Sequence, residues 1–421
     1  QPADLSKRIS ALATADQWQT FFQEIEPQIV EGDSLPIAEF QAAVIAGLSN
    51  TIPGRLRFIS PKDLQVTEQL RANRYVGIGI QLAHDQQEKL AFIVTPFRKG
   101  PAHQAGAKPG DRIVEVDGKS AHDVSVAKVV EMLRGEEGTP VTVLVRQPGS
   151  TDQRTLRMIR GVVPIDTVHG YRRGPDDSWI FRPDANLPIV YLEVNSISSS
   201  TLHELRQMEG QLQANGARAL VVDMRNCVGD SLANAALVAD AFLEEGLLWR
   251  VRDAHNRVRE YRADPDCLFR DWPVALLIDD RIGTAPSWVV AALQDNGRAI
   301  LVGQTARTLA YVKEYIPLPN NQGAVYLATK RVERAKPTPP SGDGQGEFQP
   351  IYYHTWVLKP DQEVVMNDKI RQERAVWLAA RNHTDLSKEN ALQPPEDPQL
   401  VKALEILSAR LKTPSETSTK R

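Results

Sequence analysis

The segment RIGTAPSW, residues 281–288, carries two hydroxyl groups, those of Thr284 and Ser287. A hydroxyl attacks a carbonyl carbon near neutral pH only when a base takes its proton, and a lysine can be that base where burial lowers its pKa. Lys313 follows this segment and could take that part. The residues therefore allow a Thr284 or Ser287 nucleophile with Lys313, or alternatively a capping or surface serine and a solvated lysine.

Cys227 carries a thiol, the other side chain that could act as a nucleophile. A cysteine nucleophile needs a neighbouring histidine, and no motif places His203 or His255 beside it, so we expect a small buried thiol. The sequence leaves open whether Cys227 and Cys267 form a disulfide. The eight histidines form no HExxH or other metal-ligand spacing, and no Walker-type glycine loop is present, so we expect neither a metal nor a cofactor.

A loop with two glycines, Gly77-Ile78-Gly79-Ile80, leads directly into a predicted strand. Such a loop can turn backbone N–H groups toward a terminal carboxylate, while the strand edge pairs with a peptide main chain. It could alternatively be a strand that follows a simple turn. The segment GPAHQAGAKPGDRIVEVDGKS, residues 100–120, resembles PDZ domains and favours peptide binding. We expect the groove wall to come from the next helix, through Val126, Val129 and Val130.

Composition limits the classes of partner. The 421 residues include 50 Lys and Arg against 53 Asp and Glu, a net charge of −3, so we expect no nucleic acid partner. No apolar run is long enough to span a membrane. The polar start at Gln1 lacks the regions of an export signal, so we expect any such signal to be absent from this sequence.

The apolar patterns predict the elements that position these residues. Residues 1–72 have helical periodicity, and Ser60 before Pro61 predicts the start of a helix. Short alternating runs follow from Tyr75, with one helix over residues 124–133. Beyond Pro164, buried strand runs such as LPIVYLEV alternate with helices over 202–214, 232–243 and 287–296. That alternation predicts a mostly parallel sheet covered on both faces.

The domain boundaries follow from these changes of pattern. We predict an N-terminal helical region at 1–72, a PDZ-like peptide-binding domain at 73–160, an α/β core at 161–365, and C-terminal helices with a disordered tail at 366–421.

Four segments resemble the carboxy-terminal processing peptidases, also called tail-specific proteases. They are ISPKDL from Ile59, DMRNCVGD from Asp223, ALQDNGRAILVG from Ala292 and EDPQLVKALEIL from Glu396. The resemblance implies a multidomain protein of α+β and α/β classes, with a helical arm, a PDZ-like domain and a ClpP/crotonase-like peptidase core.

The resemblance also implies where a catalytic site would lie. Members of the family use a serine nucleophile with a lysine base. Alignment through ALQDNGRAILVG places Thr284 at the serine, Leu309 at the lysine and Lys313 at a supporting glutamine. Gly229 would donate its amide to the oxyanion, although Asp230 replaces the glycine that follows it in the family, and Pro286 and Ser287 replace a Ser-Glu pair.

We therefore expect a homologue that binds polypeptide C-termini or unfolded substrates but is catalytically impaired or inactive, as an adaptor. The alternative is an active serine-type endopeptidase with a rearranged site, using Thr284 or Ser287 with Lys313. The resemblance further implies a homodimer or pairing with an active paralogue, in a periplasmic, secreted or other extracytoplasmic compartment.

Overall fold

The computed structural model describes most of the chain after residue 74. The described residues are Thr20, Glu24, 56–61, 63–64, 75–98, 100–163, 166–174, 178–318, 323–336, 355–382 and 393–412. The chain divides into two compact units. The smaller unit comprises Gln1–Gln65 with Lys313–Ala328, and the larger comprises Val66–Val312 with Thr329–Arg421.

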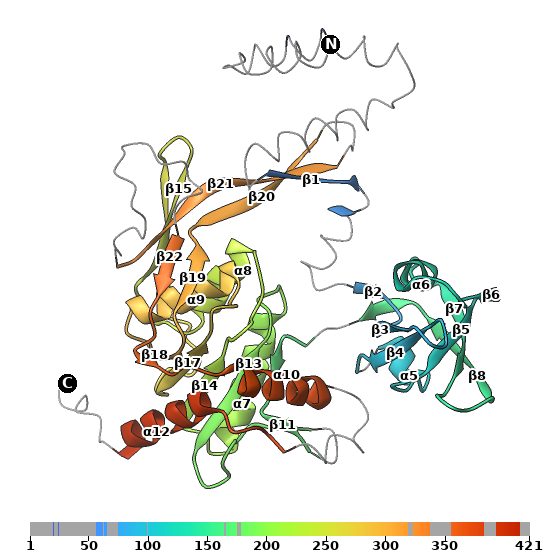
Figure 1. Ribbon diagram of the computed structural model, residues 1–421. Coiled ribbons are helices and arrows are strands. Elements are labelled where there is room, and N and C mark those ends of the chain that lie inside the picture. Colours follow the sequence, from blue (N-terminus) through green and yellow to red (C-terminus); the bar gives the residue numbers. More distant parts are fainter. Residues whose placement is uncertain are drawn as a thin grey trace, which may run out of the picture. The chain divides into compact units, whose positions relative to one another are not determined.

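The first part of the larger unit is a β-rich module with two short helices (Figure 1). Its main sheet has the strand order β3-β4-β5-β7-β8, with β6 paired to β5, and β2 pairs separately with β9. The strands are β2 (Tyr75–Gly77), β3 (Ile80–Asp85), β4 (Leu90–Pro96), β5 (Arg112–Val116), β6 (Lys119–Ser120), β7 (Pro140–Arg146), β8 (Gln153–Ile159) and β9 (Gly161–Val163). The helices are α5 (Pro101–Gln104) and α6 (Val126–Leu133).

Alternation of side chains gives this module a core of its own. Along β7, Val141, Val143 and Val145 are buried, whereas Pro140 and Thr142 are exposed. Ser125 caps α6 by accepting a hydrogen bond from the amide of Lys128. The helix therefore begins two residues later than the predicted residue 124.

The core sheet of the larger unit has the order β10-β13-β14-β17-β18-β23. All neighbouring strands in it are parallel except β10 with β13. The strands are β10 (Val168–His169), β13 (Ile189–Val194), β14 (Ala219–Asp223), β17 (Val274–Ile278), β18 (Ala299–Gly303) and β23 (Gln362–Glu363). Four helices pack on or beside this sheet: α7 (Thr201–Ala214), α8 (Leu232–Asp240), α9 (Thr284–Asp295) and α12 (Pro398–Lys412).

Both faces of this sheet are covered, as the continuous apolar runs predict. Val190 and Leu192 of β13 pack in one cluster with residues of α7, α8 and α9, whereas Ile189 and Tyr191 pack in a second cluster with α12. The prediction of a multidomain fold with a mostly parallel, doubly covered sheet is therefore confirmed.

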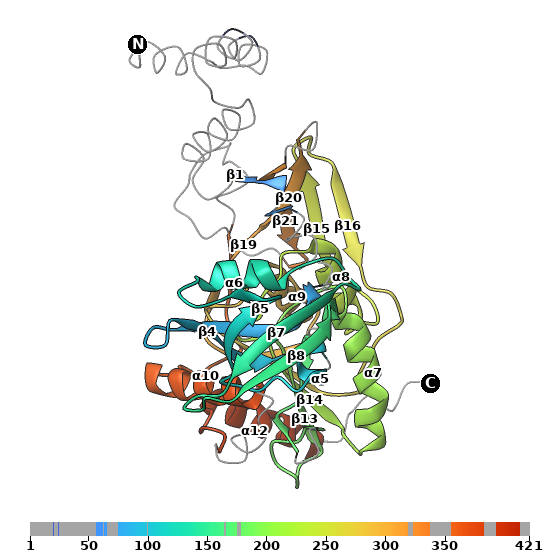
Figure 2. The same cartoon turned by 90° about the vertical axis from the view of Figure 1, so that its right-hand side faces the viewer.

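Other described strands form smaller sheets. The largest contains β1 (Leu56–Ile59), β21 (Ala324–Arg334), β15 (Leu247–Asp253) and β16 (Val258–Arg262), with β20 (Tyr311–Pro317) beside β21 (Figure 2). Two-stranded pairs are formed by β11 (Arg172–Arg173) with β12 (Trp179–Ile180), and by β19 (Ala306–Leu309) with β22 (Thr355–Leu358). Helix α10 (Asp368–Asn382) precedes α12 in the chain.

Two predictions concern the ends of the chain. Pro61, Asp63 and Leu64 are helical and Ser60 Oγ accepts a hydrogen bond from the Asp63 amide, so the helix start predicted there is confirmed. Elsewhere in the predicted N-terminal helical region, the structure describes Thr20 and Glu24, which are helical, and strand β1, which is not. The predicted C-terminal tail lies outside the described residues. The four-part domain division stays a prediction.

Candidate functional site

Thr284 is the first residue of α9, directly after the turn that follows β17. The helix thus begins three residues earlier than predicted, with extended Gly283 as its N-cap. Pro286 fits in the first turn because first-turn amides lack helical partners and a proline there removes no hydrogen bond. Thr284 is half-buried, and its hydroxyl makes no hydrogen bond to another described residue. The positive end of the helix dipole therefore lies beside this hydroxyl.

The loop after β14 reaches this helix start through backbone hydrogen bonds. The Gly283 amide donates to Cys227 O at 2.7 Å, and the Ala285 amide donates to Gly229 O at 3.2 Å. Gly229 has a φ of +150°, and a Cβ there would lie 3.1 Å from Ile197 O, so the position requires glycine. No hydrogen bond from the Gly229 amide to a described residue is found. That leaves the amide able to serve an incoming oxygen.

Asp279 joins the same two loops through its side chain. Its Oδ1 accepts from the Asn226 amide at 2.9 Å and from the Arg281 amide at 3.2 Å, while Oδ2 accepts from the Arg281 guanidinium. The carboxylate is almost fully buried. Asp279 therefore ties the turn before Thr284 to the loop that carries Gly229, a role that the sequence did not reveal.

Leu309 ends β19 and lies against α9. The indole Nε1 of Trp288 donates to Leu309 O at 3.2 Å, which brings the two positions predicted for nucleophile and base onto contacting elements. Leu309 is half-buried and offers no group that accepts a proton. Lys313 belongs to the smaller unit, where its Nζ lies 5.4 Å from the ring centroid of Tyr326. Its pairing with Thr284 stays a prediction.

Ser287 lies one turn into α9 and is fully buried. Its Oγ donates to Gly283 O at 2.7 Å, the ordinary bond of a helical serine to the carbonyl four residues earlier. The arrangement is that of a structural hydroxyl.

Cys227 is fully buried and, like Cys267, is a free thiol. Burial, with the carboxylates of Glu193 and Asp223, raises the pKa of the Cys227 thiol well above its usual value. A thiol that keeps its proton is a poor nucleophile, so the structure agrees with the small buried thiol that the sequence predicts.

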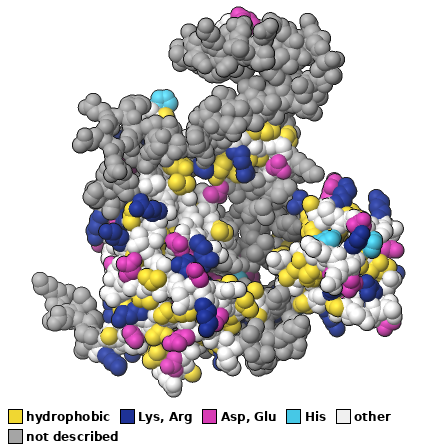
Figure 3. Space-filling model, viewed as in Figure 1, with side chains coloured by type: hydrophobic (Ala, Val, Ile, Leu, Met, Phe, Trp, Pro, Cys, Tyr) yellow, Lys and Arg dark blue, Asp and Glu magenta, His cyan; other side chains and the backbone are white. Residues whose placement is uncertain are grey.

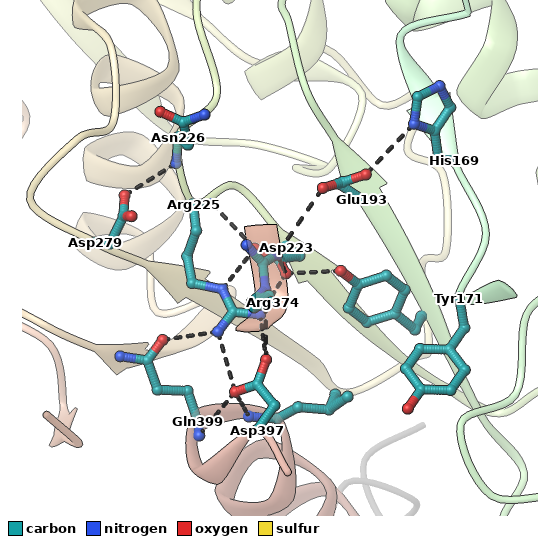
Figure 4. Close-up of polar contacts among 12 residues, drawn as sticks. His169, Tyr171, Glu193, Asp223, Arg225, Asn226, Asp279, Arg374, Asp397 and Gln399 are labelled. Atoms are coloured by element: carbon teal, nitrogen blue, oxygen red, sulfur yellow. Dashed lines mark hydrogen bonds and ion pairs between the residues drawn. The ribbon is translucent and has the colours of Figure 1, made fainter. Parts of the chain in front are cut away.

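A network of buried charges lies behind this site (Figure 4). Arg225 follows β14 and binds the Asp223 carboxylate from Nε at 2.9 Å and the Asp397 carboxylate from Nη2 at 2.7 Å. Arg374 of α10 adds a second guanidinium, 2.6 Å from Asp223 Oδ2. Arg381 pairs with Glu193. Only one pair of this network, Asp223 with Arg225, lies close together in the sequence, within the DMRN segment.

The network is electrically balanced and keeps its carboxylates ionised. Burial alone would raise the pKa of Asp223, but Arg225 and Arg374 hold it well below its usual range. Burial likewise opposes ionisation of Glu193, yet Arg381 and the hydrogen bond from His169 lower its pKa to about 2. These ion pairs tie β13 and β14 to α10 and to the start of α12, and so hold the strand ends from which the site loops depart.

The glycine loop of the β-rich module forms one side of a pocket. Ile78 O accepts from the Ala102 amide and Gly79 O accepts from the Phe97 amide, both at 2.8 Å. Because peptide units are planar and trans, the amides of Gly79 and Ile80 point the opposite way from these carbonyls. Gly79 has a φ of +73°, which glycine adopts without strain.

Apolar side chains complete this pocket. Its lining consists of Gly77, Ile78, Gly79, Ile80, Leu82, Val130 and Leu133. Of the three groove residues predicted, Val130 lines the pocket. Val129 is fully buried in the module core, and Val126 packs half-buried against that core. Leu133, one turn beyond Val130, lines the pocket where Val126 and Val129 were expected to do so.

No group of three or more His, Cys, Asp and Glu side chains in the described part of the chain could hold a metal ion. No described helix is long and apolar enough to cross a membrane.

Two regions of the chain match known protein families. The model of peptidase family S41 matches residues 188–344, and a PDZ domain model matches residues 93–147. The chloroplastic C-terminal processing peptidase of Tetradesmus obliquus is 27% identical over 277 residues, which cover 65% of this chain and 60% of that protein. The carboxy-terminal-processing protease of Bartonella bacilliformis is 27% identical over 294 residues, covering 67% and 64%.

Among solved structures, the photosystem II D1 C-terminal processing protease is 24% identical, with a TM-score of 0.43 and coverage of 77% of this chain and 81% of that one. The matched region spans about three fifths of the length of the curated relatives. By the family and domain matches, the chain contains a peptidase family S41 region, residues 188–344, and a PDZ domain, residues 93–147, and it is similar to the carboxy-terminal processing peptidases.

Proposed function

We propose that the chain binds polypeptide C-termini through its PDZ domain and is impaired or inactive as a peptidase. The observation that carries the binding is the pocket between the glycine loop and α6, which places apolar side chains beside backbone amides. Amides suit a terminal carboxylate, and Leu82, Val130 and Leu133 suit an apolar last side chain.

Leu309 supports the impairment. A threonine or serine hydroxyl needs a base, and leucine at the position of the family lysine supplies none. Removing one member of a nucleophile and base pair commonly leaves only about 10³ to 10⁴-fold catalysis over water. The protein would then serve as an adaptor that holds tails, alone, as a homodimer or with an active paralogue, in an extracytoplasmic compartment as its family resemblance implies.

Peptide binding tests the first half of the proposal. A fluorescent peptide with an apolar C-terminal residue should bind the full chain, and the same peptide with an amidated C-terminus should bind more weakly. Val130→Asp should weaken binding about tenfold or more, because a charge without a partner would face the pocket. Val130→Ala, which introduces no charge, should weaken it less.

Lys128→Ala is the matched control on the same helix, since Lys128 is exposed and pairs only with Glu131 in the described structure. Circular dichroism of each variant shows whether α6 still folds. Equal affinity of the parent and both Val130 variants for the free-acid peptide would contradict the pocket assignment.

Thr284 gives the alternative its support, since a half-buried hydroxyl at a helix N-terminus near the Gly229 amide is suited to acyl chemistry. In this alternative the chain is an active endopeptidase that uses Thr284, or Ser287, with Lys313. Mass spectrometry of an unstructured polypeptide after incubation with the parent and with Thr284→Ala separates the two. Cleavage that disappears in Thr284→Ala would establish the active enzyme.

A further inference from the structure

Strands β15, β16 and the end of β21 form a sheet with one apolar face and one charged face. Trp249, Val251 and Val332 are buried on the inner face. Side chains alternate along a strand, so Arg250 and Arg252 point to the outer face. The register places Glu260 and Glu333 opposite Arg250, and Val258 and Arg331 opposite Arg252.

The outer face carries two Arg-Glu-Arg triads side by side. In the first, Glu260 accepts from Arg250 Nε at 2.9 Å and from Arg262 Nε at 3.0 Å. In the second, Glu333 accepts from Arg252 Nε at 2.8 Å and from Arg331 Nη2 at 2.6 Å. Each carboxylate is shared by two guanidinium groups, so each triad has a net charge of +1.

This surplus is local. The whole chain has a net charge of −3, and on the side seen in Figure 3 basic and acidic side chains are interspersed. The six side chains of the triads are between 25% and 60% exposed, so the charge meets solvent. The nearby Arg257 is neutralised by Asp253. The four arginines and two glutamates thus make one exposed sheet face of charge +2.

Arg250, Arg252 and Arg262 have N–H donors that make no hydrogen bond to a described residue. Arginine has five N–H donors, and the hydrogen bond found for Arg250 uses only its Nε. For Arg252 and Arg262, no bond from Nη1 to a described residue is found. Guanidinium groups prefer carboxylate or phosphate oxygens as partners.

We propose that this outer face binds an acidic segment of another polypeptide in an extended conformation. Arg250 and Arg252 are two residues apart on one strand, a separation of roughly 6.5 to 7 Å. Every second side chain of an extended peptide has the same spacing, so alternating carboxylates would match the arginines in sequence. Val258 is the one exposed large apolar residue in β15, β16 and the described end of β21, too little to anchor a membrane surface.

A designed peptide tests the proposal without engaging the PDZ pocket. The probe is a fluorescent ten-residue peptide in which glutamate alternates with serine, with an amidated C-terminus, and its comparison peptide has glutamine in place of glutamate. The acidic peptide should bind the full chain at low salt, the glutamine peptide should not, and binding should weaken steeply as salt rises.

Variants locate the binding. Arg252→Gln with Arg262→Gln removes the net positive charge and should weaken binding about three- to tenfold. Glu260→Gln raises the face to +3 and should strengthen it. The matched control is Arg206→Gln with Arg270→Gln, since these exposed arginines pair with Asp266 and Glu244 away from the triads.

Three results would overturn the proposal. The first is that the acidic peptide does not bind, and the second is that the control variant loses as much affinity for it as the triad variant. The third is that phosphatidylserine vesicles bind in a triad-dependent way while the peptide does not bind. The acidic probe has no free C-terminal carboxylate and so does not test the PDZ pocket. A failure of the acidic peptide to bind therefore leaves the proposed PDZ function standing, and a failure of the PDZ peptide to bind leaves the proposal for the outer face standing.

Discussion

Arg225 and Asp397 form a buried ion pair, with 3.1 Å between Nη1 and Oδ1 and 2.7 Å between Nη2 and Oδ2, although 172 positions separate them. Arg225 follows β14 and Asp397 precedes α12, so the pair attaches the C-terminal helix to the strand that leads into the Gly229 loop. Asp223 and Gln399 accept hydrogen bonds from the remaining N–H groups of Arg225. The C-terminal helix is thereby part of the support of the candidate site.

Asp397→Ala should lower the free energy of unfolding by roughly 3 to 5 kcal/mol, because removing one partner leaves a buried guanidinium under-compensated. Urea denaturation followed by circular dichroism measures the change. Glu405→Ala on the same helix is the control: its exposed pair with Lys402 should contribute less than about 0.5 kcal/mol. Equal stabilities of Asp397→Ala and Glu405→Ala would show that the ion pair is not needed.

Acid should destabilise the protein through the same network. Arg381 and His169 lower the pKa of Glu193 to about 2 from 4.5, so the ionised form is favoured by folding. The stabilisation from Glu193 is therefore fully present above about pH 4.5 and is lost as the pH falls through about 2. The pKa of Asp223 is lowered also, which extends the effect in the same direction.

Glu193→Gln should be less stable than the parent at pH 7 and should lose less further stability between pH 5 and pH 2.5. Urea midpoints measured at four pH values check this, with exposed Glu405→Gln as the comparison. A parent-like pH dependence in Glu193→Gln would mean that other carboxylates govern acid unfolding.

Installing the serine and lysine that the family resemblance implies tests the proposed impairment of peptidase activity. Thr284→Ser with Leu309→Lys should produce peptidase activity, since a half-buried lysine loses its proton more readily and can act as the base. A working general base should raise the cleavage rate by about 10² to 10⁴-fold over Thr284→Ser alone. The control is Leu309→Lys with Thr284→Ala, and a double variant as inactive as this control would assign the loss to the altered loops as well.

Asp279→Ala should loosen the two site loops. The Asn226 and Arg281 amides lose their charged acceptor, at a cost of about 1 to 3 kcal/mol. Hydrogen exchange should accelerate at residues 226–230 and 280–283, as mass spectrometry of peptic fragments would detect. Asp280→Ala is the neighbouring control, because Asp280 is exposed and pairs with Arg371 instead. Unchanged exchange in Asp279→Ala would rule out its positioning role.

Local patterns in the sequence were sufficient for the architecture. Predominantly apolar runs such as that of Ile189–Val194 identify strands buried on both faces, and this strand does pack in two clusters. The glycine loop and the apolar face of α6 likewise predicted a pocket. Periodicity did not decide which valines face it, because positions one turn apart share a face only approximately. In the structure, Leu133 lines the pocket beside Val130, whereas Val126 and Val129 do not.

The sequence by itself determined that a threonine and a leucine stand where a nucleophile and its base are expected, since residue types are fixed by the chain alone. The tertiary structure decided what surrounds them: Asp279 between the two loops, and Arg225 with Asp397 behind them. Partners so distant in sequence leave no local pattern, because their pairing depends on where strands and helices end in space rather than on their periodicity. In the same network, arginine partners lower the pKa values of Asp223 and Glu193, although burial alone would raise them.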